Sequence, residues 1–154
     1  MPSTYSCLSY HIVFTTKRRA RYLSPEIRPR VYEYLGGVVR AEGGSLTEIG
    51  GVEDHVHLLV KLKPTQSLAD FVRTLKANSS KWINENRLVS SRFEWQEGYG
   101  AFTVSESQTS AVSRYLQRQA EHHARTTFAE EVSRLCERHG VTPPTESPGR
   151  GGSA

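Results

Sequence analysis

Alternating apolar and polar positions predict the β-strands of this chain. In residues 5–16, apolar side chains recur at every second position among aromatic and β-branched residues, as in a strand with one buried face; they are Leu8, Tyr10, Ile12 and Phe14. Residues 46–52 predict a short second strand that contains two adjacent glycines, and residues 55–62 predict a third. Glu53 and Asp54 lie between these two strands, so they can form the turn of a hairpin.

Apolar positions at helical spacing predict four helices. The first is expected to begin after Ser24, an N-cap residue that a proline and a glutamate follow. The second is expected to begin after Ser67, whose spacing to Asp70 resembles a capping box. The third and fourth are expected at about 107–124 and 127–138.

The order of these elements predicts the fold class. Residues 93–96 and 101–104 add two strand pieces around a glycine-rich turn. The order β-α-β-β-α-β is that of a ferredoxin-like (RRM-like) α+β domain, here with two additional C-terminal helices. Both earlier helices would cover one face of the antiparallel sheet and leave the other open for a site or a partner. We expect one domain over residues 1–141 and a disordered tail over 142–154, which is poor in apolar residues.

The third predicted strand carries two imidazoles on one face. Alternation places His55, His57 and Leu59 on the face opposite the core residues of the same strand. Imidazole is the commonest protein ligand for metals and an acid or base near neutral pH. Cross-strand hydrogen bonding explains such a pair equally well, so the pair alone decides neither. His11, in the first strand, could hydrogen-bond to a metal ligand and orient it, or it could be a hydrogen-bonded structural histidine.

One face of the third helix groups three polar side chains. Tyr115, Gln119 and His122 fall at i, i+4 and i+7, beside a separate apolar stripe. This spacing fits a surface tyrosine beside a solvated glutamine as well as a catalytic pair.

Composition limits the classes of function. The 154 residues have a net charge of +4, a pI of about 9.2 and a mean hydropathy of −0.53. The chain contains no apolar run of membrane-spanning length and no signal-peptide pattern, and Cys7 and Cys136 match neither a zinc motif nor a disulfide framework. We therefore expect a cytoplasmic protein, and its basic charge, concentrated at residues 17–21, favours a polyanionic partner.

Three segments resemble the small HUH single-tyrosine transposases of bacterial insertion sequences (TnpA type, with their REP-associated relatives). They are Tyr10-His11-Ile12-Val13-Phe14-Thr15-Thr16-Lys17, Asp54-His55-Val56-His57-Leu58-Leu59-Val60 and Tyr115-Leu116-Gln117-Arg118-Gln119-Ala120-Glu121-His122-His123. The likeness covers roughly residues 5–140, and the segments occur in the order of the family.

The resemblance implies a reaction and a set of residues. His55, His57 and Gln119 would hold a divalent ion, magnesium or manganese, and Tyr115 would be the nucleophile. The enzyme would cut and rejoin single-stranded DNA through a 5′-phosphotyrosine intermediate and recognise hairpins at the ends of the element. The family also implies a homodimer in which the tyrosine helix of one subunit completes the histidine site of the other.

Other residues are candidates for substrate contact. Single strands are commonly bound by a positive groove and aromatic stacking. The candidates for phosphate contact are Lys17, Arg18, Arg19, Arg73, Lys76 and Lys81, and Tyr99 is the candidate for stacking. Asp54 and His122 are possible accessory residues of the site.

Three other functions remain open at this point. The chain could be a domesticated REP-associated relative acting on chromosomal hairpins. It could also be a non-catalytic nucleic-acid-binding module or a small metallohydrolase in which Tyr115 is incidental.

Overall fold

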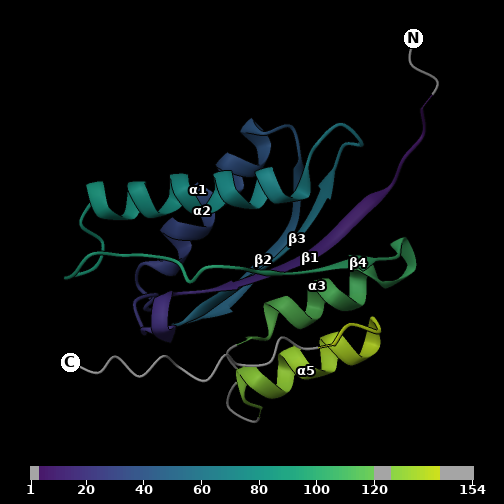
Figure 1. The fold of residues 1–154 in the computed structure, drawn as a ribbon. Helices are drawn as coiled ribbons and strands as arrows, with labels where there is room; N and C mark the ends of the chain where they lie inside the picture. The colour runs from purple at the N-terminus through teal and green to yellow at the C-terminus, as the bar shows by residue number, and fades with distance from the viewer. Residues whose placement is uncertain (1–3, 120–125, 143–154) are drawn as a thin grey trace.

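A four-stranded antiparallel sheet lies at the centre of the computed structural model, which describes residues 4–119 and 126–142 (Figure 1). The strands are β1 (Leu8–Thr15), β2 (Ser45–Val52), β3 (His55–Leu62) and β4 (Gly100–Val104), in the order β2-β3-β1-β4. The predicted α+β class is confirmed. His122 and most of the predicted tail lie outside the described residues.

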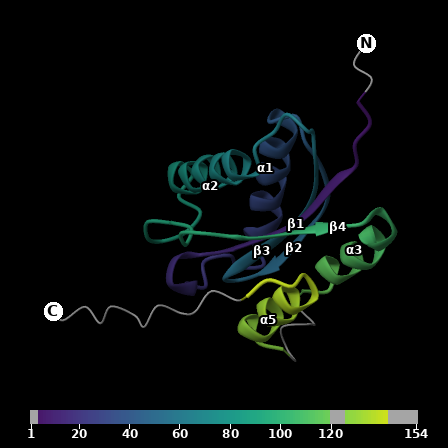
Figure 2. The same ribbon diagram turned by 45° about the vertical axis from the view of Figure 1, so that its right-hand side comes forward.

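Two helices cover one face of the sheet, and two further helices lie against the other face (Figures 1 and 2). The first pair is α1 (Arg28–Ala41) and α2 (Leu68–Glu85), and the second is α3 (Thr109–Gln117) and α5 (Phe128–Arg138). Short 3-10 helices, η1 (Lys17–Arg19) and η2 (Glu106–Gln108), occur in the connections. The main core fills the layer beneath α1 and α2 and includes Ile12, Phe14, Val56, Leu58, Val60 and Leu75.

The starts of the first two helices differ in how well the sequence predicts them. The hydroxyl of Ser67 accepts a hydrogen bond from the backbone N–H of Asp70 at 3.3 Å, so the predicted cap of α2 is confirmed. The predicted cap of α1 is wrong, since that helix begins at Arg28. The carbonyl of Ser24 accepts hydrogen bonds from the N–H groups of Ile27 and Arg28, so a turn precedes the helix. Pro29 suits the first turn because it lacks an N–H.

Two other expectations need correction. Residues 93–96 form no strand, only an isolated bridge between Trp95 and Thr16, because side chains of α2 hold this segment. The indole N–H of Trp95 donates to the hydroxyl of Ser79 at 2.8 Å. The third helix is interrupted within its predicted range, because α3 ends at Gln117 and Arg118 leaves helical geometry with φ −103° and ψ 19°; residues 120–124 of that range lie outside the described residues.

The face that carries the histidines is not open, contrary to the sequence expectation. α3 and α5 cover it, and His55 and His57 are completely buried. α3 approaches β2 at a glycine: a Cβ atom at Gly50 would lie 2.0 Å from the carbonyl oxygen of Leu116. Only glycine permits this approach, which brings the helix directly onto the sheet backbone.

Candidate metal and tyrosine site

The two histidines occupy an interior strand. β3 pairs with β2 on one side and β1 on the other, so His57 lies between Gly50 and Val13 in the antiparallel register. Ladder hydrogen bonds on both sides fix the backbone at both histidines. The pleat then directs both imidazoles to the face beneath α3 and α5, as the alternation predicts.

A second residue orients each imidazole. Oδ1 of Asp54 lies 2.7 Å from Nδ1 of His55, and Nε2 of His11 lies 2.7 Å from Nδ1 of His57. The guanidinium of Arg19 in turn donates to Oδ2 of Asp54 at 3.2 Å. With both Nδ1 atoms engaged, Nε2 is the atom that each ring presents to the site, an arrangement common among metal-binding histidines.

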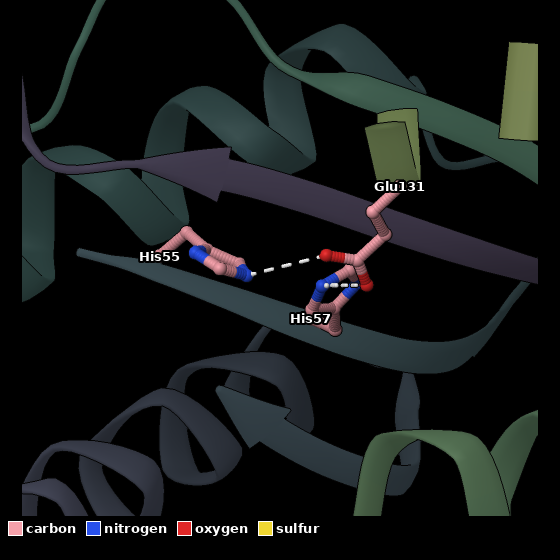
Figure 3. A group of neighbouring side chains, drawn as sticks. All are labelled: His55, His57 and Glu131. Atoms are coloured by element: carbon pink, nitrogen blue, oxygen red, sulfur yellow. Dashed lines mark ion pairs between the residues drawn. The ribbon is translucent and has the colours of Figure 1, made fainter. Parts of the chain in front are cut away.

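Glu131 of α5 completes the cluster (Figure 3). Its carboxylate lies 3.0 Å from Nε2 of His57 and 3.7 Å from Nε2 of His55. One ligand atom from each of these three buried residues can be chosen so that all lie within 4.8 Å of one another. Two imidazole nitrogens and a carboxylate oxygen are a donor set that divalent transition metals bind.

The sequence predictions omitted Glu131, although a signal for it exists. Its position in the predicted fourth helix is three residues after Phe128 and four before Leu135, among the residues that pack against the sheet. An acidic residue on the apolar stripe of an amphipathic helix is rarely buried without partners. Its partners lie on β3 and α3, and no spacing along the chain identifies them.

Tyr115 and Gln119 both reach Glu131. The Tyr115 hydroxyl donates a hydrogen bond to Oε1 of Glu131, and Nε2 of Gln119 lies 3.2 Å from the same oxygen. The Tyr115 ring centroid is 5.9 Å from that of His57. The structure therefore brings Tyr115, His55, His57 and Gln119 together within one chain, although Gln119 lies beyond the end of α3.

Burial and neighbouring side chains together set the pKa values in this cluster, with opposite effects on Glu131 and His55. Burial would raise the pKa of Glu131, but hydrogen bonds from His55 and His57 and their positive charge lower it to about 2. Burial would lower the pKa of His55, but hydrogen bonds to Asp54 and Glu131 raise it. Burial, together with the charge of His57, lowers the pKa of His11 to about 3. Glu131 is therefore an anionic carboxylate and His11 a neutral imidazole near neutral pH.

The predicted DNA contacts fall into two groups. Four of them line a hollow of about 700 Å³ between α2 and residues 92–99: Arg73, Lys76, Lys81 and Tyr99. α2 covers the other face of the sheet, so this group lies away from Tyr115. The ammonium of Lys76 donates to the carbonyls of Gln96 and Gly98 at 2.6 and 2.8 Å, which gives it a structural role.

The second group, Lys17, Arg18 and Arg19, forms η1 after β1. Lys17 pairs with Glu94 at 2.9 Å. Arg19 pairs with Asp54 and lies over the ring of Phe128, 4.6 Å from its centroid, so this arginine supports the site. Asp54 lies in the turn that the sequence predicts, and its hydrogen bond to His55 places it beside the cluster, while an accessory role stays a prediction.

Comparison with known proteins assigns the chain to a family. The model of the family described as "Transposase IS200 like" matches residues 4–119. The chain belongs to the IS200-like transposase family. The matched segment contains His55, His57, Tyr115 and Gln119, whereas Glu131 lies beyond it.

Relatives and solved structures agree with this assignment. This chain is 27% identical to the ISDra2 transposase TnpA of Deinococcus radiodurans over 117 residues, which are 73% of this chain and 84% of the relative. It is 29% identical to the transposase for insertion sequence element IS200 of Salmonella typhimurium, and the match covers 73% of this chain and 76% of that relative. A crystal structure of a putative transposase from Deinococcus radiodurans has a TM-score of 0.64 at 25% identity, covering 77% and 95%.

The fold also matches that of a REP-associated tyrosine transposase solved bound to a REP hairpin. The TM-score is 0.60 at 13% identity, over 93% of this IS200-like chain and 87% of the other. Among the described residues, no helix combines the length and apolar character needed to cross a membrane.

Proposed function

We propose that this transposase cuts and rejoins single-stranded DNA with Tyr115 as its nucleophile. One observation carries the proposal: the Tyr115 hydroxyl is hydrogen-bonded to a buried carboxylate that also contacts both histidines. This arrangement supports Tyr115 as the nucleophile, because its hydroxyl has an anionic hydrogen-bond acceptor beside side chains that could hold a metal ion. Membership of the family supports the DNA-processing role.

The proposed reaction is the one that the resemblance to HUH transposases implies, with these groups in its roles. The Tyr115 oxygen attacks phosphorus, the bond from phosphorus to the 3′ oxygen breaks, and the DNA keeps a 5′-phosphotyrosine link to the protein. A free phenol has a pKa of about 10, so it needs activation at neutral pH. Oε1 of Glu131 accepts the hydroxyl hydrogen bond and orients the phenol oxygen, whose proton passes to water, while the leaving 3′ oxygen takes up a proton from water. Attack by a new 3′-hydroxyl reverses the step and joins the strands.

The donor set fits a divalent ion. His55, His57 and Glu131 would hold it, with Gln119 as a further ligand. Two imidazoles favour manganese or zinc over magnesium, whereas the resemblance to HUH transposases implies magnesium or manganese. Manganese satisfies both arguments and is the ion that we propose. When bound, such an ion neutralises charge that develops on the phosphate oxygens.

DNA hairpins are the proposed substrate. The solved REP-associated transposase was captured with a REP hairpin, and this chain shares its fold. We propose recognition of hairpins at the ends of a mobile element. Chromosomal hairpins, as for a domesticated relative, are the alternative, and cleavage of hairpins from the two sources distinguishes them.

A protein–DNA adduct tests the nucleophile. Labelled single-stranded hairpin DNA is incubated with the protein and manganese, then separated under denaturing conditions. We expect an adduct that EDTA abolishes, that Tyr115→Phe lacks and that the matched variant Tyr99→Phe retains, since Tyr99 lies away from the site. An adduct that persists in Tyr115→Phe would overturn the assignment, and hairpin binding without any adduct would favour a binding module.

Mixed dimers test whether sites are shared between subunits. We keep the homodimer with active sites shared in trans as a prediction from the resemblance. Within one chain, Tyr115 lies beside His57, so a single chain also contains all the residues proposed for the site. Mixing Tyr115→Phe with His57→Ala chains restores cleavage only if the sites are shared, and no recovery in verified mixed dimers would show that each chain acts alone.

A further inference from the structure

A cleft between α3 and α5 leads to the proposed nucleophile. It has a volume of about 400 Å³, within the range of about 300–1,000 Å³ typical of small-ligand pockets. Its lining includes the buried side chains of His11 and Glu131 and the partly buried Tyr115. Figures 1 and 2 both show α3 and α5 side by side over the same face of the sheet.

The two walls of the cleft differ in chemistry. α3 contributes Ala111 and Val112, and Leu135 of α5 adds a third apolar side chain. α5 also contributes two arginines, Arg134 and Arg138, which are one helical turn apart and therefore on the same side of the helix. The cleft thus combines a small apolar wall with two cations, the combination that suits a sugar or base and the phosphates beside it.

Both guanidiniums are available for a ligand. Arg134 and Arg138 are exposed, and neither forms an ion pair within residues 4–119 and 126–142. The acidic residue that lines the cleft, Glu131, already contacts Tyr115 and both histidines.

The hollow beside α2 is a weaker candidate for the same strand. Its cations already have partners: Arg73 pairs with Asp70, Lys81 lies 3.9 Å from Glu85, and Lys76 is bonded to two carbonyls. Its lining also includes three glutamates, Glu85, Glu94 and Glu97. It lies beside α2, on the other side of the sheet from α3, the helix that contains Tyr115.

Packing fixes the position of the arginines. Cys136 is buried against Val13 and Phe102, and the Thr127 hydroxyl caps α5 by accepting from the N–H of Glu130 at 3.2 Å. Glu131 joins the same helix to the histidines. The two guanidiniums are therefore carried by a helix that is held at both the sheet and the site.

We propose that this cleft binds the single-stranded DNA that adjoins the cleaved bond, with Arg134 and Arg138 each contacting a backbone phosphate. The inference rests on the proposed function, because it takes Tyr115 as the point of attack. It adds a contact from α5, a helix outside the segment that the family model matches. These arginines position the strand and take no part in the chemistry.

Binding measured without cleavage tests the inference. The probe is a fluorescein-labelled hairpin with a single-stranded flank, titrated with protein in EDTA at several salt concentrations and followed by anisotropy. We expect Arg134→Ala and Arg138→Ala each to weaken binding by about fivefold at low salt. Each should reduce the slope of log affinity against log salt by about 0.7, the value for one phosphate contact of a single strand.

Control variants separate this role from general effects of charge and folding. Arg40→Ala removes an exposed arginine of α1, on the other face of the sheet, and should leave affinity and slope unchanged. A double variant with Arg134→Lys and Arg138→Lys keeps both positive charges. It should therefore keep most of the salt slope that the alanine variants lose. A hairpin without the flank should respond to none of the substitutions.

The result separates the two proposals. Arginine variants with wild-type affinity and salt slope would overturn the cleft, while an adduct at Tyr115 would still support the proposed function. Loss of slope in the arginine variants, with no adduct in the wild type, would support the cleft and overturn the nucleophile. Loss of slope that the lysine variant fails to restore would contradict phosphate contact.

Discussion

Nε2 of His11 lies 2.7 Å from Nδ1 of His57, and both rings are buried beneath α3 and α5. Burial and the neighbouring His57 lower the pKa of His11 to about 3, so His11 is a neutral imidazole. One ring therefore donates an N–H to the other, and the tautomer of each is set by its partner. This bond connects β1 to the proposed metal ligand on β3.

Removal of His11 should weaken metal binding. Residues that orient a ligating imidazole commonly contribute about 10- to 100-fold to metal affinity. We expect a loss of this size for manganese in His11→Ala, measured by isothermal titration calorimetry. Tyr10→Phe, at the adjacent position on the opposite face of β1, is the control. Wild-type affinity in His11→Ala would show that His57 is oriented without it.

Metal binding should stabilise the folded chain. A ligand at 100 times its Kd adds about 2.7 kcal/mol, which corresponds to roughly 5–10 °C in Tm for a chain of this length. We expect such a rise with manganese in thermal melts, and EDTA should reverse it. Glu131→Gln keeps the side-chain shape but removes the charge, so its rise should be much smaller. An equal rise in His57→Ala would place the bound ion elsewhere.

Gly50→Ala should displace α3. The added Cβ would meet the carbonyl oxygen of Leu116 at 2.0 Å, and backbone cannot yield as a flexible side chain does. Overpacking of this kind costs about 1–3 kcal/mol. We expect a reduced stability in urea denaturation and at least a roughly tenfold loss of adduct formation, because Tyr115 is carried by the same helix.

Gly37→Ala is the matched control for that substitution. Gly37 is inside α1, and its nearest neighbour would be the end of the Arg40 side chain at 4.0 Å. Replacing a helical glycine by alanine stabilises by about 0.5–1 kcal/mol. We expect unchanged cleavage in Gly37→Ala, and equal cleavage by the two alanine variants would contradict the role of Gly50.

We expect Lys76 to contribute to the stability of the fold rather than to DNA binding. Its ammonium holds the carbonyls of Gln96 and Gly98, so Lys76→Met should lower the free energy of unfolding by about 1–2 kcal/mol in urea denaturation. Arg73→Met, on the same helix, removes only an exposed pair and should change it by less than about 0.5 kcal/mol. Unchanged stability with lost hairpin binding in Lys76→Met would restore the original hypothesis of a phosphate contact.

Local patterns were sufficient to predict most of the fold. Alternation located β1, β2 and β3, and helical spacing with a capping box located α2. These features depend on neighbours a few residues away, so sequence spacing contains them. Residues 93–96 have the composition of a strand, but the bond from Trp95 to Ser79 decides their position, and that bond joins segments 16 residues apart.

The site residues likewise could be predicted only where the informative residues lie close together in the sequence or in a family motif. The pleat of β3 placed His55 and His57 on one face, and the resemblance supplied Tyr115 and Gln119. Glu131 was beyond both arguments, because its contact with the histidines exists only once α5 packs over the sheet. The same packing explains why the histidine face is covered rather than open.

The contact between Gly50 and α3 has a consequence for protein engineering. Most helices meet a sheet through interlocking side chains, so an exchange of those side chains shifts the helix. At Gly50 the sheet meets the carbonyl of Leu116, a group that every amino acid provides. Exposed positions of α3, such as Ser110 and Arg114, should therefore accept new side chains without moving Tyr115. These positions are suitable places to install altered DNA preferences while the chemistry is retained.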